Sequence, residues 1–492
     1  MFSASISRNV TATLLQVIIT GIAYFVLYRF MYMHLGVDQI GVWSIVLAST
    51  SVSRLADLGL SASVVRHVAR AVGEGDNELV GTTIESTTVS LAVLMGAVLC
   101  GSYFPLRYVL EFSISSSALD LGLQILPYAL VSLWVSILST VFLGGLDGHQ
   151  RIDLRATVVI LSVLLYLVLA VALVPRFGLM GIAYAQIAQA LASASLSWLM
   201  LRRVAQALPL LPLHWKWRVL KPMIGYGLNM QIIAVMSFLF DPVTKLVMGK
   251  LGGMDSLGYY EMASKLVLQF RSLVVEANRV VIPIIAGADS QTERYQDKGG
   301  LFFLASYQIV FFCSVVLYSS LSMLMPAISV LWTGDFAPKL VIYGQLLISG
   351  WFINTLIGPA FFSNVGTGQL RDNVVSQAII GAGGSLMGCA GGLLLEGIGV
   401  VTGVIVGLVC GSIYLLWRHV KSMGLEWPAT LLPKGMLPLV IGAIFGSLAL
   451  NQLGLIVSPV NALIAIPVFV LLWNLLCAVH PVSRELIRQV RQ

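Results

Sequence analysis

Long apolar segments recur along almost the whole chain, and short polar segments separate them. A helix needs about 20 apolar residues to cross the ~30 Å hydrocarbon core of a bilayer, and fourteen segments meet this requirement. Shorter segments of alternating polarity, which would predict a membrane barrel, do not occur. The pattern therefore predicts an all-α integral membrane protein with about fourteen transmembrane helices. The predicted spans are 10–31, 40–62, 82–104, 122–144, 155–174, 179–200, 222–247, 257–282, 301–325, 337–362, 374–395, 398–418, 437–455 and 458–479.

Composition supports this fold class. Hydrophobic residues make up 58% of the chain and charged residues only 10%, whereas soluble proteins are about 25% charged. The N-terminus lacks a short apolar region followed by a cleavage site, so no removable signal peptide is predicted. The five cysteines lie within predicted spans without paired spacing. We therefore expect neither a disulfide framework nor a metal site.

The positive charge of the chain follows its predicted topology. The formal net charge is +7, and most of the 29 lysines and arginines fall in alternate loops. Cytoplasmic loops of membrane proteins are enriched in these residues. This rule places both termini in the cytoplasm, and it explains the charge without a nucleic-acid partner.

Two halves of the chain carry similar motifs. LGVDQIGVW (35–43) matches LGGMDSLGYY (251–260), and GLDGHQRID (145–153) matches NVGTGQLRDN (364–373), at offsets of about 217 and 220 residues. Such periodicity indicates a duplicated helical bundle. Six helices in each copy would give both copies one orientation, related by a pseudo-two-fold axis along the membrane normal. The predicted divisions are an N-lobe (1–201), a cytoplasmic linker (202–221), a C-lobe (222–420), two peripheral helices (437–479) and a cytoplasmic tail (480–492).

The HWKWR cluster of the linker, residues 214–218, has two interpretations. It suits an interfacial helix with aromatic and basic side chains at the lipid headgroups. It equally suits a cytoplasmic loop that obeys the positive-inside rule.

Ionisable residues inside the spans cluster in the first two helices of each lobe. Each costs at least ~2.5 kcal/mol at the centre of a membrane helix, so we expect these side chains to face protein or water. Their spacing predicts local ion pairs three or four residues apart, and the same residues can line a water-filled cavity. The predicted pairs are Arg54 with Asp57, Asp241 with Lys245, Glu261 with Lys265, and Glu276 with Arg279.

Arg271 has no acidic residue three or four positions away. Alignment of Gly41 with Gly258 makes it the repeat counterpart of Arg54. Two guanidinium groups facing each other across a cavity would repel unless an anion lay between them, and their planar donors suit phosphate oxygens. We therefore predict an anionic, phosphate-bearing substrate. The predicted substrate-binding residues are Arg54, Arg271, Lys265, Lys245 and Arg279, and the predicted coupling or pairing carboxylates are Asp57, Asp241, Glu261 and Glu276.

Enzymatic motifs do not occur in the chain. HExxH, GxxxxGK[ST] and GxSxG are absent, so we expect a transporter without a cofactor, driven by a proton or sodium gradient, by the membrane potential or by the substrate's own gradient. The glycine cluster at 381–392 lies inside a span and favours close helix packing rather than a phosphate loop. A membrane polymerase or ligase would need a large external loop, whereas the longest here is about 105–121.

Several motifs together resemble one family. They are LG-x4-G-VW near residue 35, ADLGLSASVVRHVA, the G-x-x-x-G-x-x-R pattern from Gly144 to Arg151, and GLMGIA. Residues 1 to about 420 resemble the polysaccharide-biosynthesis (O-antigen) flippases of the multidrug/oligosaccharidyl-lipid/polysaccharide (MOP) exporter superfamily. The resemblance implies a V-shaped, two-lobe transporter like the multidrug and toxic-compound exporters (MATE). It would move an undecaprenyl-pyrophosphate-linked oligosaccharide from the cytoplasmic to the periplasmic leaflet by alternating access, with cavity cations on the pyrophosphate.

The resemblance also implies a setting and two alternatives. The setting is the bacterial inner membrane, where lipid-linked oligosaccharide and membrane lipids are the expected partners. Polysaccharide polymerase or assembly proteins are possible further partners, and the protein can function as a monomer. An ion-coupled multidrug exporter of the same superfamily would bind cations through Asp57, Asp241 and Glu261. The extra pair of helices leaves open a similarity to the fourteen-helix lipid II flippases, where the added helices form a groove for the lipid tail.

Overall fold

Helices make up nearly all of the described part of the chain. The computed structural model describes residues 2–51, 59–114, 116–205, 208–209, 212–223, 240–278, 294–367, 370–424, 432, 435–456 and 459–481. No strand occurs among these residues, and the all-α prediction is confirmed. The chain divides into two compact units, residues 1–258 and 259–492, and each is described by itself.

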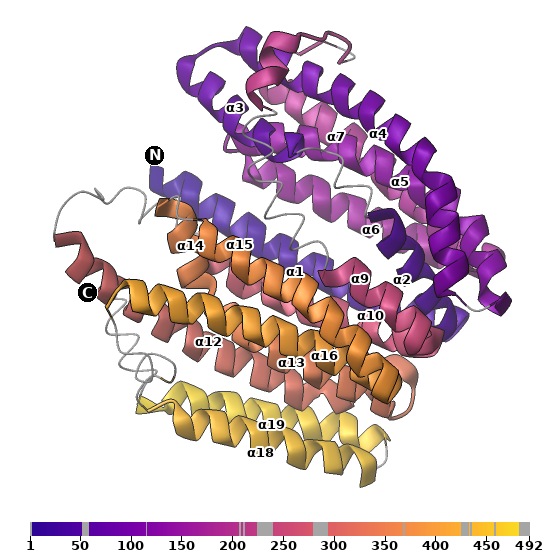
Figure 1. Cartoon of the computed structure of the whole chain (residues 1–492), viewed down its shortest axis with the longest axis vertical. Helices are drawn as coiled ribbons and strands as arrows, with labels where there is room; N and C mark the ends of the chain where they lie inside the picture. The colour runs from indigo at the N-terminus through magenta and orange to yellow at the C-terminus, as the bar shows by residue number, and fades with distance from the viewer. Residues whose placement is uncertain are drawn as a thin grey trace. The chain divides into compact units, whose positions relative to one another are not determined.

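The first unit is organised around one long helix, α5 (Figure 1). In the most apolar stretch of α5, 67% of the residues are buried. The corresponding shares in α1, α4, α6 and α7 are only 22–33%. Helices α2, α3, α4 and α7 pack around α5, while α1 packs along α6. The helices are α1 (Phe2–Leu35), α2 (Val37–Ser51), α3 (Leu60–Glu74), α4 (Asn77–Ser113), α5 (Ser116–Gly148), α6 (Ile152–Phe177), α7 (Leu179–Val204) and α9 (Phe240–Leu251), followed by the first turn of α10.

The second unit is built on α12, which packs against α13, α18 and α19. A short π-helical segment, Ile379–Gly383, joins α15 to α16. The helices are α10 (Gly253–Asn278), α12 (Arg294–Thr333), α13 (Pro338–Leu356), α14 (Gly358–Thr367), α15 (Arg371–Ala378), α16 (Gly384–Ser422), α18 (Leu437–Ile456) and α19 (Pro459–Val479).

Where the chain is described, the predicted spans fall on these helices, although the count of fourteen is approximate. Residues 52–58 of span 40–62 and 224–239 of span 222–247 lie outside the described residues. Among the described residues, seven helices are long and apolar enough to cross a membrane, and the bent pair Pro338–Leu356 with Gly358–Val365 makes an eighth. One of the seven, Arg371–Ser422, contains two predicted spans, because only a kink at Leu395 and Glu396 separates them. The helices α18 and α19 are apolar but shorter. The division into lobes stays a prediction from the repeat.

The repeated motifs contact each other reciprocally within the first unit. A Cβ atom built on Gly41 would overlap the carbonyl oxygen of Met254, and a Cβ on Gly258 would overlap the carbonyl oxygen of Val37. The offset of 217 residues that aligns Gly41 with Gly258 also aligns Val37 with Met254. Such reciprocity is the property of an interface around a two-fold axis. Only glycine permits this close approach of helix backbones.

The glycine cluster in the second unit also packs helix against helix. Across the kink at Glu396, Gly391 lies against Gly399, and Gly384 lies against Gly407. The segments before and after the kink therefore form a tight helical hairpin, as the packing interpretation of this cluster predicts.

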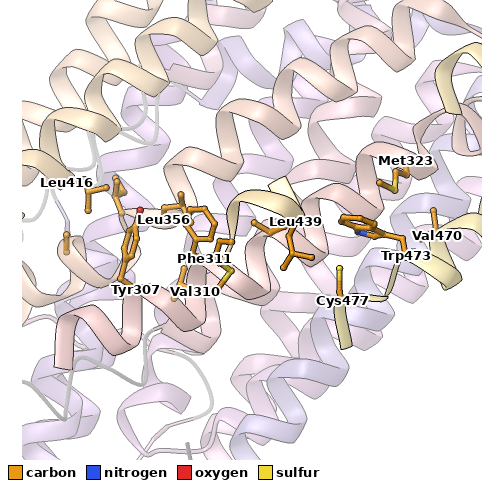
Figure 2. Close-up of a cluster of buried hydrophobic side chains, with 14 of the residues drawn as sticks. Tyr307, Val310, Phe311, Met323, Leu356, Leu416, Leu439, Val470, Trp473 and Cys477 are labelled. Atoms are coloured by element: carbon orange, nitrogen blue, oxygen red, sulfur yellow. The ribbon is translucent and has the colours of Figure 1, made fainter. Parts of the chain in front are cut away.

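Helices α18 and α19 are joined to α12 by apolar packing and by specific hydrogen bonds. Trp473 of α19 packs near Met323 and Val470 at one end of the buried cluster in Figure 2, and Tyr307 lies at the other end. The Trp473 indole donates to Ser319 Oγ at 2.8 Å. Further polar contacts link these helices to their neighbours, and the four shortest follow. They are Ser322 with Ser447 (2.7 Å), Asn474 with Ser320 (3.0 Å), and Gln345 with Asn451 in both directions (2.8 Å each).

We expect Gly41→Val and Gly258→Val to destabilise the protein to a similar extent, by about 1–3 kcal/mol each, because each places a side chain against a backbone carbonyl. Gly101→Val is the matched control, since a Cβ there meets nothing within 4 Å. Thermal unfolding of the purified protein measures the effect. Strongly unequal losses would contradict a reciprocal contact.

Gln345→Leu should lower the free energy of unfolding by about 1–3 kcal/mol, because Asn451 would lose its partner within the membrane. The double variant Gln345→Leu/Asn451→Leu should recover most of the loss, since both polar groups are then removed. The same unfolding assay measures this recovery. If the double variant loses as much unfolding free energy as the two single variants together, the two amides do not act as one unit.

Candidate functional site

Arg271 of α10 contacts two residues of α13 in the second unit. Its Nη2 donates a hydrogen bond to Asn354 Oδ1 at 3.0 Å. The guanidinium carbon lies 4.5 Å from the centroid of the Trp351 ring, a cation–π contact. An amide and an aromatic face therefore hold the guanidinium from two sides.

Helix α13 presents these two residues together, just before it breaks. Trp351 and Asn354 are three positions apart and so share one face. The break follows at Ile357, where α13 and α14 are bent by 43°. Gly358 and Pro359 account for the bend, because proline lacks the N–H that would continue the helix.

Asn354 is fixed by a third helix. Its Nδ2 donates to Ser412 Oγ of α16 at 3.0 Å, and the Ser412 hydroxyl donates to the Leu408 carbonyl at 2.7 Å. Asn354 is 6% exposed and Ser412 is fully buried. Helices α10, α13 and α16 are thus connected through one chain of hydrogen bonds that ends at a positive charge.

No carboxylate pairs with Arg271 in the part of the chain that the structure describes. Its Nε is buried there and has no hydrogen-bond partner. Arginine stays protonated in proteins, and no described side chain neutralises the charge that Arg271 places beside the membrane-spanning pair α13 and α14. Such a charge is costly to retain, and it can bind an anion.

Two of the four predicted ion pairs have both partners described, and both of these pairs are present. Lys245 Nζ lies 2.9 Å from an Asp241 oxygen in the first unit, and Lys265 Nζ lies 3.6 Å from a Glu261 oxygen in the second. One partner of each pair is buried: Lys245 is 7% exposed beside Asp241 at 42%, and Glu261 is 1% exposed beside Lys265 at 43%. These carboxylates therefore already have cationic partners. Their roles in binding or coupling stay predictions.

For four of the predicted site residues, the structure does not describe the side chain. Arg54 and Asp57 fall in 52–58, and Arg279 falls in 279–293. Glu276 belongs to α10, but its side chain is not among those described. The predicted opposition of Arg54 and Arg271 therefore stays a prediction. Among the described residues, no group of three or more His, Cys, Asp or Glu side chains could hold a metal ion.

Sequence reasoning missed a buried carboxylate, Glu85 of α4. Its Oε2 accepts a hydrogen bond from the backbone N–H of His214 at 3.0 Å and lies 2.8 Å from His214 Nδ1. Two further bonds continue along the linker, from Lys216 N to Ser86 Oγ (3.0 Å) and from Trp215 Nε1 to Ser90 Oγ (2.9 Å). The sequence did contain a signal for this site, because Glu85 is the only acidic residue in the predicted span 82–104.

The HWKWR cluster is therefore partly a loop and partly a helix. Residues 212–216 are non-helical and run along α4, while residues 217–223 are helical. Trp215 and Trp217 are both about half exposed.

An apolar groove of about 470 Å³ lies between α4 and α5 of the first unit. It is lined by Gly96, Leu99, Cys100, Tyr103, Phe104, Pro127, Leu130, Val131 and Trp134. None of these side chains is charged, so the groove is not a candidate anion site.

The long apolar helices define a class of protein, the multi-pass membrane proteins. Among solved structures, the lipid II flippase MurJ in its inward closed conformation matches with a TM-score of 0.73 at 14% identity, over 98% of this chain and 99% of that chain. An inward-facing multidrug resistance MATE family transporter of the MOP superfamily matches with a TM-score of 0.70 at 15% identity, over 82% and 94%. A MOP superfamily transporter from Pyrococcus furiosus matches with a TM-score of 0.55 at 16% identity, over 87% of this chain and 95% of that chain. These likenesses establish the MOP-type fold.

Residues 26–338 match the family described as "Polysaccharide biosynthesis protein". This match covers more than half of the chain, and the chain belongs to that family. No curated protein sequence matches the chain. The predicted family and fold are confirmed, and both are those of transporters rather than enzymes.

Glu85→Ala should release the linker from α4, because the His214 backbone N–H loses its acceptor. We expect limited trypsin digestion after Lys216 and Arg218 to become several-fold faster. Glu74→Ala removes an exposed carboxylate that pairs with Arg70 on its own helix, and it serves as the control. Equal cleavage rates in both variants would show that Glu85 does not hold the linker.

Proposed function

We propose that this protein is a flippase for an undecaprenyl-pyrophosphate-linked oligosaccharide, a repeat unit of a surface polysaccharide. It carries the lipid from the cytoplasmic to the periplasmic leaflet of the bacterial inner membrane by alternating access, with both termini in the cytoplasm. Arg271 binds the pyrophosphate, and Arg54 is its counterpart in the other lobe. Polysaccharide polymerase or assembly proteins are the proposed partners, and the monomer is the working unit.

The single observation that carries this proposal is the positive charge at Arg271, which no described carboxylate neutralises. A forked guanidinium is suited to phosphate oxygens, and the pyrophosphate joins the sugar to the polyprenyl chain in such lipids. Family membership supports the polysaccharide part of the proposal. The fold supports the flipping part, since a lipid II flippase is among the proteins that share it.

The charge balance argues against a drug exporter that binds cations. Such a protein would need carboxylates that are free to bind the drug, whereas Asp241 and Glu261 already pair with lysines on their own helices. The polarity of the binding pocket differs among members of this superfamily, since the Pyrococcus furiosus transporter is described as having a binding pocket of reverse polarity. The driving force is a proton or sodium gradient or the membrane potential.

The decisive experiment follows a labelled polyprenyl-pyrophosphate oligosaccharide between the leaflets of proteoliposomes, with and without an ion gradient. Arg271→Gln should lower the rate of movement at least tenfold, because the pyrophosphate loses its cation. Arg107→Gln is the matched control, since Arg107 is half exposed and pairs with Glu111, and it should move the lipid at the normal rate. Failure of the wild-type protein to move the lipid, together with export of cationic dyes, would overturn the proposal in favour of drug export.

A further inference from the structure

We infer that Asn354 determines the charge of the substrate that this site accepts, because it positions Arg271 with a neutral amide and leaves the positive charge available. The inference rests on the proposed function and names the residue that makes the Arg271 site specific for an anion. Asn354 acts through Arg271 and is a positioning residue.

The orientation of the Asn354 amide follows from its partners. The Ser412 hydroxyl hydrogen is committed to the Leu408 carbonyl, so Ser412 Oγ can only accept from Asn354. Nδ2 of Asn354 must therefore face Ser412, and Oδ1 must face Arg271. The amide cannot be reversed without losing both bonds.

Two other cations of the predicted site are held differently. Lys245 and Lys265 each have a carboxylate four residues away on their own helix. Arg271 instead has an amide from another helix and the face of Trp351. Both groups fix the guanidinium in space, and neither cancels its charge.

A carboxylate at position 354 would have nearly the same shape as the amide. It would accept the same hydrogen bond from Arg271, and Ser412 could donate to it only by giving up its bond to the Leu408 carbonyl. The carboxylate would make the cluster neutral. Asn354→Asp is therefore a nearly isosteric change that removes net charge while it preserves the contact between α10 and α13. A purely structural role predicts that this variant is harmless, and a role in charge selection predicts loss of anion binding.

The test uses the full-length protein in nanodiscs and measures binding of polyprenyl pyrophosphate, polyprenol and inorganic pyrophosphate. Asn354→Asp should weaken polyprenyl pyrophosphate binding at least tenfold, leave binding of uncharged polyprenol unchanged, and keep or raise the Tm. Arg271→Gln should give the same loss, and the double variant should be no weaker than either single variant. Binding of inorganic pyrophosphate alone with the same dependence would identify a free anion, rather than a lipid headgroup, as the ligand.

Two results would overturn different conclusions. Normal binding by Arg271→Gln would refute the Arg271 site of the proposed function. Loss of binding by Arg271→Gln with normal binding by Asn354→Asp would leave that site intact and refute the role of Asn354.

If Asn354→Asp fails to fold, the Asn354→Leu variant tests the inference instead, because leucine is uncharged and similar in size to asparagine. Binding within about threefold of wild type would support charge neutrality as the function of Asn354. A loss as large as that of Arg271→Gln, with a normal Tm, would refute it.

Discussion

The absence of water in the hydrocarbon core is the constraint on which the rest of this structure depends. A polar group there must find its partner within the protein. Many hydroxyl groups do so locally, as when Thr87 donates to the carbonyl of Thr83 and Ser162 to that of Val158. Amides reach across helices, as Gln345 does to Asn451. Because apolar side chains pack against lipid as well as against each other, these polar links and the glycine contacts do most to select helix neighbours.

Charged groups follow the same constraint in two ways. Asp241 with Lys245 and Glu261 with Lys265 satisfy each other within one helix, so neither pair needs a ligand. Arg271 is satisfied through neutral groups, which fix its position but not its charge. The difference lies in tertiary structure, because only the packing of α13 against α10 brings Asn354 and Trp351 to the guanidinium. A basic side chain can therefore be held by a carboxylate on its own helix or by neutral groups of another helix, and only the first arrangement cancels its charge.

This distinction also explains how far sequence reasoning could go. Helix positions and the two ion pairs were predictable, because a run of apolar residues and a spacing of four depend only on the local geometry of a helix. Asn354 and Trp351 were not predictable, since nothing in an apolar span indicates which helix lies opposite. Glu85 gave a signal in the sequence, but its partner His214 is 129 residues away. The predicted span at 40–62 contains a left-handed turn at Gly59, after which α3 begins at Leu60, and its residues 52–58 lie outside the described part of the chain.

The reciprocal contact between the two repeated motifs has a consequence for how such a chain can change. A duplicated protein is usually free to let its copies diverge, since each copy folds on its own residues. Here Gly41 touches the motif that contains Gly258, and Gly258 touches the motif that contains Gly41, so the two motifs form one shared surface. A side chain added, or a residue inserted, in one motif changes the surroundings of both. The two motifs therefore constrain each other at this position, whatever changes occur in the rest of the chain.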